Sequence, residues 1–125
     1  MTLATALSLS LACVAVCGAF QNNPPLVCNL KAISAAERPR YSDLVKRLRI
    51  AVADQSEIAE GYTYKVDVGK IPLIEVAEWM TMERLCCPFL AFQLNMSTSG
   101  ELWMTLRGPE GVKAILREEF PGKAD

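Results

Sequence analysis

The spacing of apolar residues predicts a long helix near the start of the folded part of the chain. Apolar side chains recur every three or four positions across residues 34–55, the spacing of one helix face: Tyr41, Leu44, Val45, Leu48, Ala51 and Val52. Ser34 and Glu37 have the spacing of a capping box, which places the helix start at residue 34. Pro39 favours a second interpretation, a short first turn after which the helix restarts at Pro39.

Shorter apolar runs predict the remaining elements. Residues 26–30 form a short apolar run compatible with a first strand, and residues 62–68 alternate apolar and polar side chains as a half-buried strand does. Helical spacing returns over residues 73–87, and Pro88 ends that helix. The last three predicted elements are a strand at 89–96, a strand at 101–108 after a glycine-containing loop, and a helix at 110–120.

The predicted order β-α-β-α-β-β-α indicates an α+β fold with a mostly antiparallel sheet and helices packed on one face. We expect one domain over residues 26–120, with a short tail at 121–125. The uncovered face of such a sheet either meets water or is buried in a dimer interface. The sequence leaves both arrangements open, and the second predicts a homodimer through this face.

Residues 1–25 predict a leader that precedes the domain. Residues 3–20 are apolar, and the first thirty residues contain no Lys, Arg, Asp or Glu. An export signal cleaved after Ala19 would place the domain in the periplasm or outside the cell, although the usual positive first region is missing. An uncleaved segment would anchor the domain to a membrane through residues 3–20, and a wrongly assigned start would leave it in the cytoplasm.

Composition excludes several kinds of site. The chain has 125 residues, a net charge of −1 and no histidine. The absence of histidine excludes Ser-His-Asp, Cys-His and histidine-zinc sites within one chain. The near-neutral charge gives no reason to expect a nucleic-acid partner. No catalytic residue and no bound cofactor can be assigned, so the five cysteines carry the candidate chemistry.

Two adjacent cysteines at the end of the 73–87 helix form the candidate site. Helix geometry puts Cys87 on the apolar stripe and Cys86 near its boundary, and Glu83 lies three and four residues before them. Neighbouring residues are too close for a relaxed disulfide. Two thiolates suit one soft ion instead, with Cys28 as third ligand and Glu83 beside the sulfurs.

Two other interpretations of the pair remain. A helix C-terminus raises the pKa of a thiol, and a C-C pair is a weaker metal signal than C-x-x-C. Buried cysteines are common, so Cys86 and Cys87 also fit simple packing of the helix end. Thiol redox chemistry is the third interpretation.

The segment around the cysteine pair resembles a family of small uncharacterised bacterial proteins. They share an E-R-x-C-C-P-F core, a following hairpin and a G-P-E-G-V-K helix start, and the likeness covers residues 26–120. Similar segments occur beside regulators of mercury and other heavy metals, so the resemblance implies heavy-metal binding. The apolar leader departs from the family pattern. The matching core residues are Glu83, Arg84, Cys86, Cys87, Pro88 and Phe89.

Overall fold

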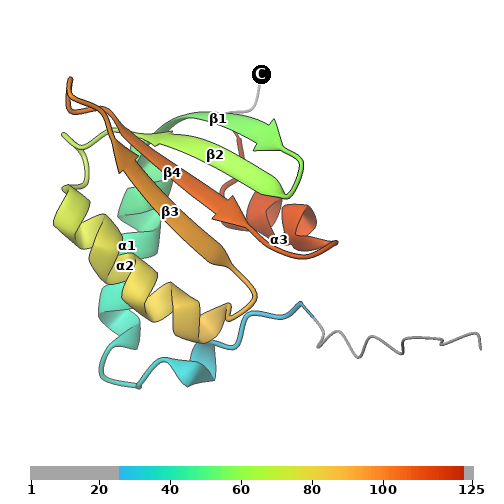
Figure 1. Cartoon of the computed structure of the whole chain (residues 1–125). Coiled ribbons are helices and arrows are strands. Elements are labelled where there is room, and N and C mark those ends of the chain that lie inside the picture. Colours follow the sequence, from blue (N-terminus) through green and yellow to red (C-terminus); the bar gives the residue numbers. More distant parts are fainter. Residues whose placement is uncertain (1–25, 123–125) are drawn as a thin grey trace, which may run out of the picture.

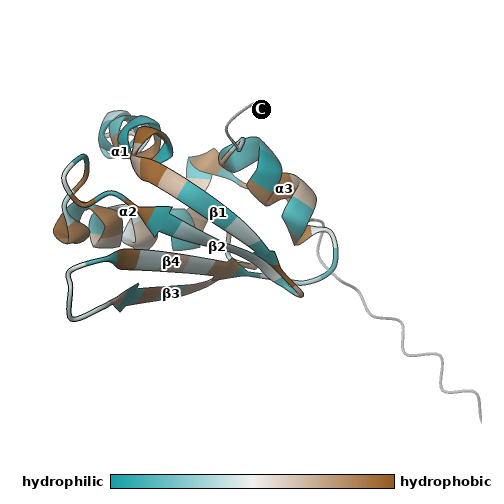
Figure 2. Cartoon of the chain, turned by 90° about the horizontal axis from the view of Figure 1, so that it is seen from above, coloured by the Kyte–Doolittle hydropathy of each residue, from teal (hydrophilic) through white to brown (hydrophobic). Residues whose placement is uncertain are grey.

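The computed structural model describes residues 26–122, which form one antiparallel sheet covered by helices on one face (Figures 1 and 2). The sheet has the strand order β1-β2-β4-β3 and consists of two antiparallel hairpins joined through β2 and β4. The predicted α+β class is therefore confirmed. In chain order the elements are η1 (Leu30–Ala32), α1 (Arg38–Ala51), β1 (Val52–Ile58), β2 (Gly61–Val66), α2 (Leu73–Cys86), β3 (Ala91–Met96), β4 (Leu102–Arg107) and α3 (Val112–Glu119).

The prediction of a first strand at residues 26–30 was wrong. This segment leads into the 3-10 turn η1, and the backbone N–H of Asn29 donates to the carbonyl of Cys86 at 2.8 Å instead of joining the sheet. The missing strand is β1, which follows α1 directly and takes residues that helical spacing had assigned to the helix. Pairing with β2 overrides the helical pattern there, because its backbone groups find partners across the hairpin.

The start of α1 agrees with the second interpretation, because the helix begins at Arg38 with Pro39 in its first turn. Ser34 and Glu37 still interact. The Ser34 hydroxyl donates to the Glu37 carboxylate at 2.7 Å and accepts from the Glu37 backbone N–H at 3.3 Å. These bonds stabilise the turn that precedes the helix rather than the helix itself.

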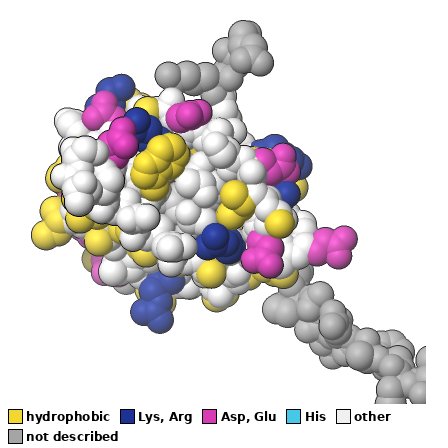
Figure 3. All heavy atoms as spheres, turned by 45° about the horizontal axis from the view of Figure 1, so that its top comes forward, with side chains coloured by type: hydrophobic (Ala, Val, Ile, Leu, Met, Phe, Trp, Pro, Cys, Tyr) yellow, Lys and Arg dark blue, Asp and Glu magenta, His cyan; other side chains and the backbone are white. Residues whose placement is uncertain are grey.

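The two faces of the sheet differ sharply in polarity. The inward side chains of β2 and β4 are all buried: Tyr62, Tyr64, Val66, Leu102, Met104 and Leu106. On the outer face Thr63 and Thr105 share a hydrogen bond of 3.1 Å, and the Lys65 ammonium lies 5.8 Å from the centre of the Trp103 ring. Figure 3 shows scattered hydrophobic side chains over the middle of the visible face and a group of them at its left edge. The homodimer through this face stays a prediction.

Aromatic side chains fill the core between α2 and the sheet. Trp79 has no exposed surface, and the centre of its ring lies 5.9 Å from those of Phe92 and Phe120. The Phe120 ring in turn lies 4.9 Å from that of Tyr64. These contacts fix the inward face of α2, whose last residue is Cys86.

The predicted leader, residues 1–25, lies outside the described residues, as do residues 123–125 of the tail. Export, anchoring and a cytoplasmic location stay predictions. Within residues 26–122, no helix combines the length and apolar character needed to cross a membrane.

Candidate functional site

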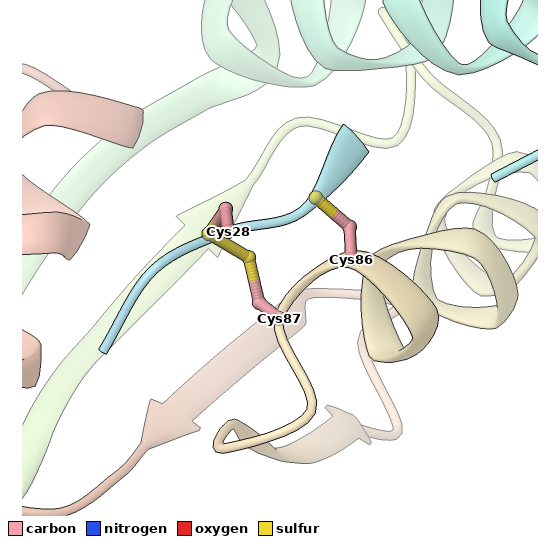
Figure 4. Close-up of side chains that lie close together, drawn as sticks. All are labelled: Cys28, Cys86 and Cys87. Carbon is pink, nitrogen blue, oxygen red and sulfur yellow. A yellow bond between two sulfur atoms is a disulfide. The ribbon is translucent and has the colours of Figure 1, made fainter. Parts of the chain in front are cut away.

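Three cysteines meet where the N-terminal segment crosses the end of α2 (Figure 4). Cys28 and Cys87 form a disulfide, with their Cα atoms 4.7 Å apart. Cys86 is the free cysteine of the described residues, and the three sulfurs all lie within 4.8 Å of one another. The three cysteines that the sequence singled out as candidate ligands therefore lie together, which the sequence left open for Cys28, and the disulfide was not foreseen.

The end of α2 explains why adjacent cysteines have different partners. Cys86 is the last helical residue, whereas Cys87 follows in a non-helical conformation and donates its backbone N–H to the Glu83 carbonyl at 2.7 Å. Pro88 then prevents the helix from continuing. In Figure 4 the Cys87 side chain reaches Cys28 while the Cys86 sulfur lies apart from that bond.

The predicted division into one inward and one boundary thiol was wrong, because both sulfurs are buried. Cys86 is 2% exposed and Cys87 is 1% exposed. The buried face of α2 runs through Val76, Trp79 and Cys86, so it is rotated from the face that the apolar pattern indicated. Cys87 lies beyond the helix, where helical spacing no longer places a side chain.

Cys86 is a poorly ionised thiol. Burial is the main cause that raises its pKa from 9.0 to about 11, and the Glu83 carboxylate raises the pKa further. The nearby Tyr41 hydroxyl, which donates its hydrogen bond to Glu83, lowers the pKa of Cys86. The sequence predicted a raised thiol pKa from the helix end, but desolvation provides most of the shift.

Glu83 is the buried carboxyl group beside this thiol. It is 1% exposed and accepts a hydrogen bond of 2.6 Å from the Tyr41 hydroxyl. Burial raises the pKa of Glu83 to about 7, the charge of Glu119 adds to the rise, and the Tyr41 hydrogen bond lowers the pKa. The indole N–H of Trp79 also lowers this pKa, although it lies outside hydrogen-bonding geometry.

Glu83 thus lies close enough to Cys86 to raise the pKa of its thiol, and its role beside a bound ion stays a prediction. Sequence reasoning missed Tyr41 and Glu119. The Glu119 carboxyl has one buried oxygen without a partner among the described residues, and burial raises its pKa. No spacing pattern links these two residues to Glu83, because Tyr41 lies on α1 and Glu119 on α3, whereas Glu83 lies on α2.

A cavity of about 390 Å³ has Cys28, one residue of the disulfide, in its wall. We call it the Cys28 cavity. Cys28 is partly exposed there, in contrast to the buried Cys87. The cavity lies between the N-terminal segment, α1 and α3, and its lining residues are Leu26, Val27, Cys28, Arg49, Ile115, Glu118 and Glu119.

The arrangement can act in three chemical ways. The disulfide crosslinks the N-terminal segment to α2, the three sulfurs together can hold one soft ion once reduced, and the disulfide can exchange with another thiol.

The resemblance to the family of small bacterial proteins stays a prediction. No family model, curated protein or solved structure matches the chain.

Proposed function

We propose that the reduced protein binds a soft metal or metalloid ion, preferentially a trivalent one such as As(III), through Cys28, Cys86 and Cys87. The observation that supports this function is the mutual approach of three sulfurs within 4.8 Å. Soft thiolate ligands select soft ions. The N-terminal segment supplies Cys28, and the end of α2 supplies Cys86 and Cys87.

The sulfur separations suit a shared ion after a small adjustment. A metal-thiolate bond is about 2.3 Å long, so three sulfurs around one ion lie at most about 4.0 Å apart. The widest separation here must shorten slightly, and the bonded pair must separate. A bonded disulfide sulfur is not a thiolate, so ion binding requires the Cys28–Cys87 disulfide to be reduced first.

Charge balance favours a trivalent ion. Three thiolates neutralise a trivalent ion, whereas Hg(II) or Cu(I) would leave net negative charge in the site. Cys86 and Cys87 are buried, and the nearby Glu83 carboxyl provides no compensating positive charge. An uncompensated charge in such surroundings is costly.

Proton balance supports the same choice. Arsenite in neutral water is the uncharged species As(OH)3. Each As–O bond is replaced by an As–S bond, and the departing hydroxide takes the thiol proton and leaves as water. Three thiols thus yield three waters, and no free thiolate has to form in advance. The raised pKa of Cys86 therefore does not oppose binding.

The test is an anaerobic titration of phosphine-reduced protein with arsenite. Replacing Cys13 and Cys17 by Ser first removes the two leader cysteines as competing ligands. Native mass spectrometry counts bound arsenic, and a thiol assay counts the cysteines that it consumes. We expect one arsenic per chain and the loss of all three thiols.

The matched controls are the Cys86→Ser variant and the oxidised protein. Cys86→Ser removes one sulfur at a buried site with a small change of volume, and the three-thiol complex should disappear. Circular dichroism checks that the variant is folded. A folded, reduced protein that takes up no arsenite, or takes it up equally without Cys86, contradicts the proposal and leaves packing as the role of the cysteines.

A further inference from the structure

We infer that a small-molecule thiol opens the Cys28–Cys87 disulfide by attacking the sulfur of Cys28 from the Cys28 cavity. This inference deepens the proposed function, because opening the bond frees two of the three ligands. It also assigns a substrate class, small thiols, to the cavity. It is tested without any ion, so the two proposals can fail separately.

Access decides which sulfur is attacked. Thiol-disulfide exchange requires the incoming thiolate to reach one sulfur of the bond. Cys28 is partly exposed and lines the cavity, whereas Cys87 is 1% exposed and is absent from the cavity wall. The two ends of the disulfide are therefore chemically unequal, and Cys28 is the end that a solute can approach.

The size and lining of the cavity select a small partner. A volume of about 390 Å³ is near the lower end of the range of small-molecule sites. Leu26, Val27 and Ile115 provide apolar contacts. Arg49, whose guanidinium donates to the Glu119 backbone carbonyl, adds a positive charge to the wall. Glu118 and Glu119 oppose a strongly anionic partner, so we expect a small neutral thiol to react well.

The reaction has two balanced steps. In the first, the thiolate forms a bond to the Cys28 sulfur, the Cys28–Cys87 bond breaks, and Cys87 leaves with the electron pair and takes a proton. In the second, another thiolate attacks the small-molecule sulfur of this mixed disulfide and releases the Cys28 thiol. Two small thiols are oxidised to one disulfide, and the protein gains two electrons and two protons.

Cys86 shortens the lifetime of the mixed disulfide. Its sulfur lies within 4.8 Å of both others, so it can displace the small thiol from Cys28 and form a Cys28–Cys86 bond. Removing this thiol closes one of the two internal routes, and the acid quench stops the other, in which the released Cys87 thiol restores the original bond. Cys86→Ser removes the thiol without changing either end of the disulfide.

The first experiment treats the oxidised Cys86→Ser protein with β-mercaptoethanol, quenches the reaction with acid and locates the adduct by peptide mass spectrometry. Cys13→Ser and Cys17→Ser are included in the same chain. We expect the adduct on Cys28 to exceed that on Cys87 at least about tenfold, because access governs which sulfur is attacked. An adduct mainly on Cys87 overturns the inference.

The second experiment fills the cavity. Ile115 lines it, whereas the neighbouring Ala114 on α3 is exposed and does not. Ile115→Trp should slow disulfide reduction by β-mercaptoethanol about tenfold or more by limiting access, while Ala114→Trp leaves the rate near that of the parent. Equal rates of disulfide reduction in the two variants would overturn the role of the cavity. So would a disulfide that β-mercaptoethanol leaves intact and that only a protein thiol oxidoreductase reduces.

Discussion

Replacing Glu83 by Gln should make the folding stability of the protein depend less on pH. Glu83 is buried, and its pKa in the folded protein is raised from an ordinary 4.5 to about 7. The folded state therefore keeps a proton that the unfolded state has already lost between these two pH values. Because the folded state binds more protons there, the free energy of unfolding falls as pH rises through this window.

The size of the effect follows from the shift. A rise from 4.5 to about 7 is worth about 3 kcal/mol at 1.36 kcal/mol per pKa unit. The free energy of unfolding has lost this full amount once the pH exceeds the pKa of Glu83 in the folded protein. Gln has nearly the shape of the protonated acid and carries no charge, so Glu83→Gln should gain up to about 3 kcal/mol relative to the parent between pH 4.5 and pH 8.

The assay is urea unfolding of both proteins at a series of pH values, with the disulfide intact. Glu78→Gln on the same helix is a control of opposite sign, because its hydrogen bond to Arg40 lowers the pKa of Glu78. That variant should lose stability relative to the parent as pH rises through 4.5. A stability difference for Glu83→Gln that stays flat from pH 4.5 to 8, or falls, refutes the view of Glu83 as a desolvated acid.

Two further predictions concern the crosslink and the sheet. Reduction of Cys28–Cys87, or Cys28→Ser, should lower the free energy of unfolding by about 4 kcal/mol. This is the chain-entropy value for a separation of 59 residues. An unchanged midpoint of urea unfolding would contradict this prediction. Gly61→Ala should lower the melting temperature more than Gly69→Ala, because a Cβ at Gly61 would lie 1.9 Å from the Leu106 carbonyl oxygen, whereas a Cβ at Gly69 would meet only the Asp67 side chain, at 3.1 Å. A smaller loss at Gly61 would show that the β2–β4 contact relaxes at little cost.

Much of the fold could be predicted from periodicity. The alternation in β2 and the hairpin around residues 97–100 are local signals, and both elements form where the sequence placed them. The β1 strand was missed because its residues continue an amphipathic helical pattern, and only the pairing with β2 decides between the two structures. That pairing is a tertiary contact, which residue spacing does not report.

The sequence indicated which cysteines belong to the candidate site but not which of them form the disulfide. Ligand chemistry singled out Cys28 as the candidate third ligand but did not decide whether it reaches the tandem pair, whereas the position of Pro88 correctly marked the end of the helix. Which cysteine pairs with Cys28 depends on one non-helical residue, Cys87, whose direction no helical pattern gives. Tyr41 and Glu119 come from other helices, so their approach to Glu83 follows only from packing.

The Cys28–Cys87 crosslink also has a mechanical consequence. The ring that it closes contains α1, β1, β2 and α2, whereas β3, β4 and α3 lie outside it. Tension between the two ends of the chain passes from Cys28 across the sulfur bridge to Cys87 and then to β3. The elements inside the ring are shielded from stretching, and a thiol that opens the bridge places them in the load path.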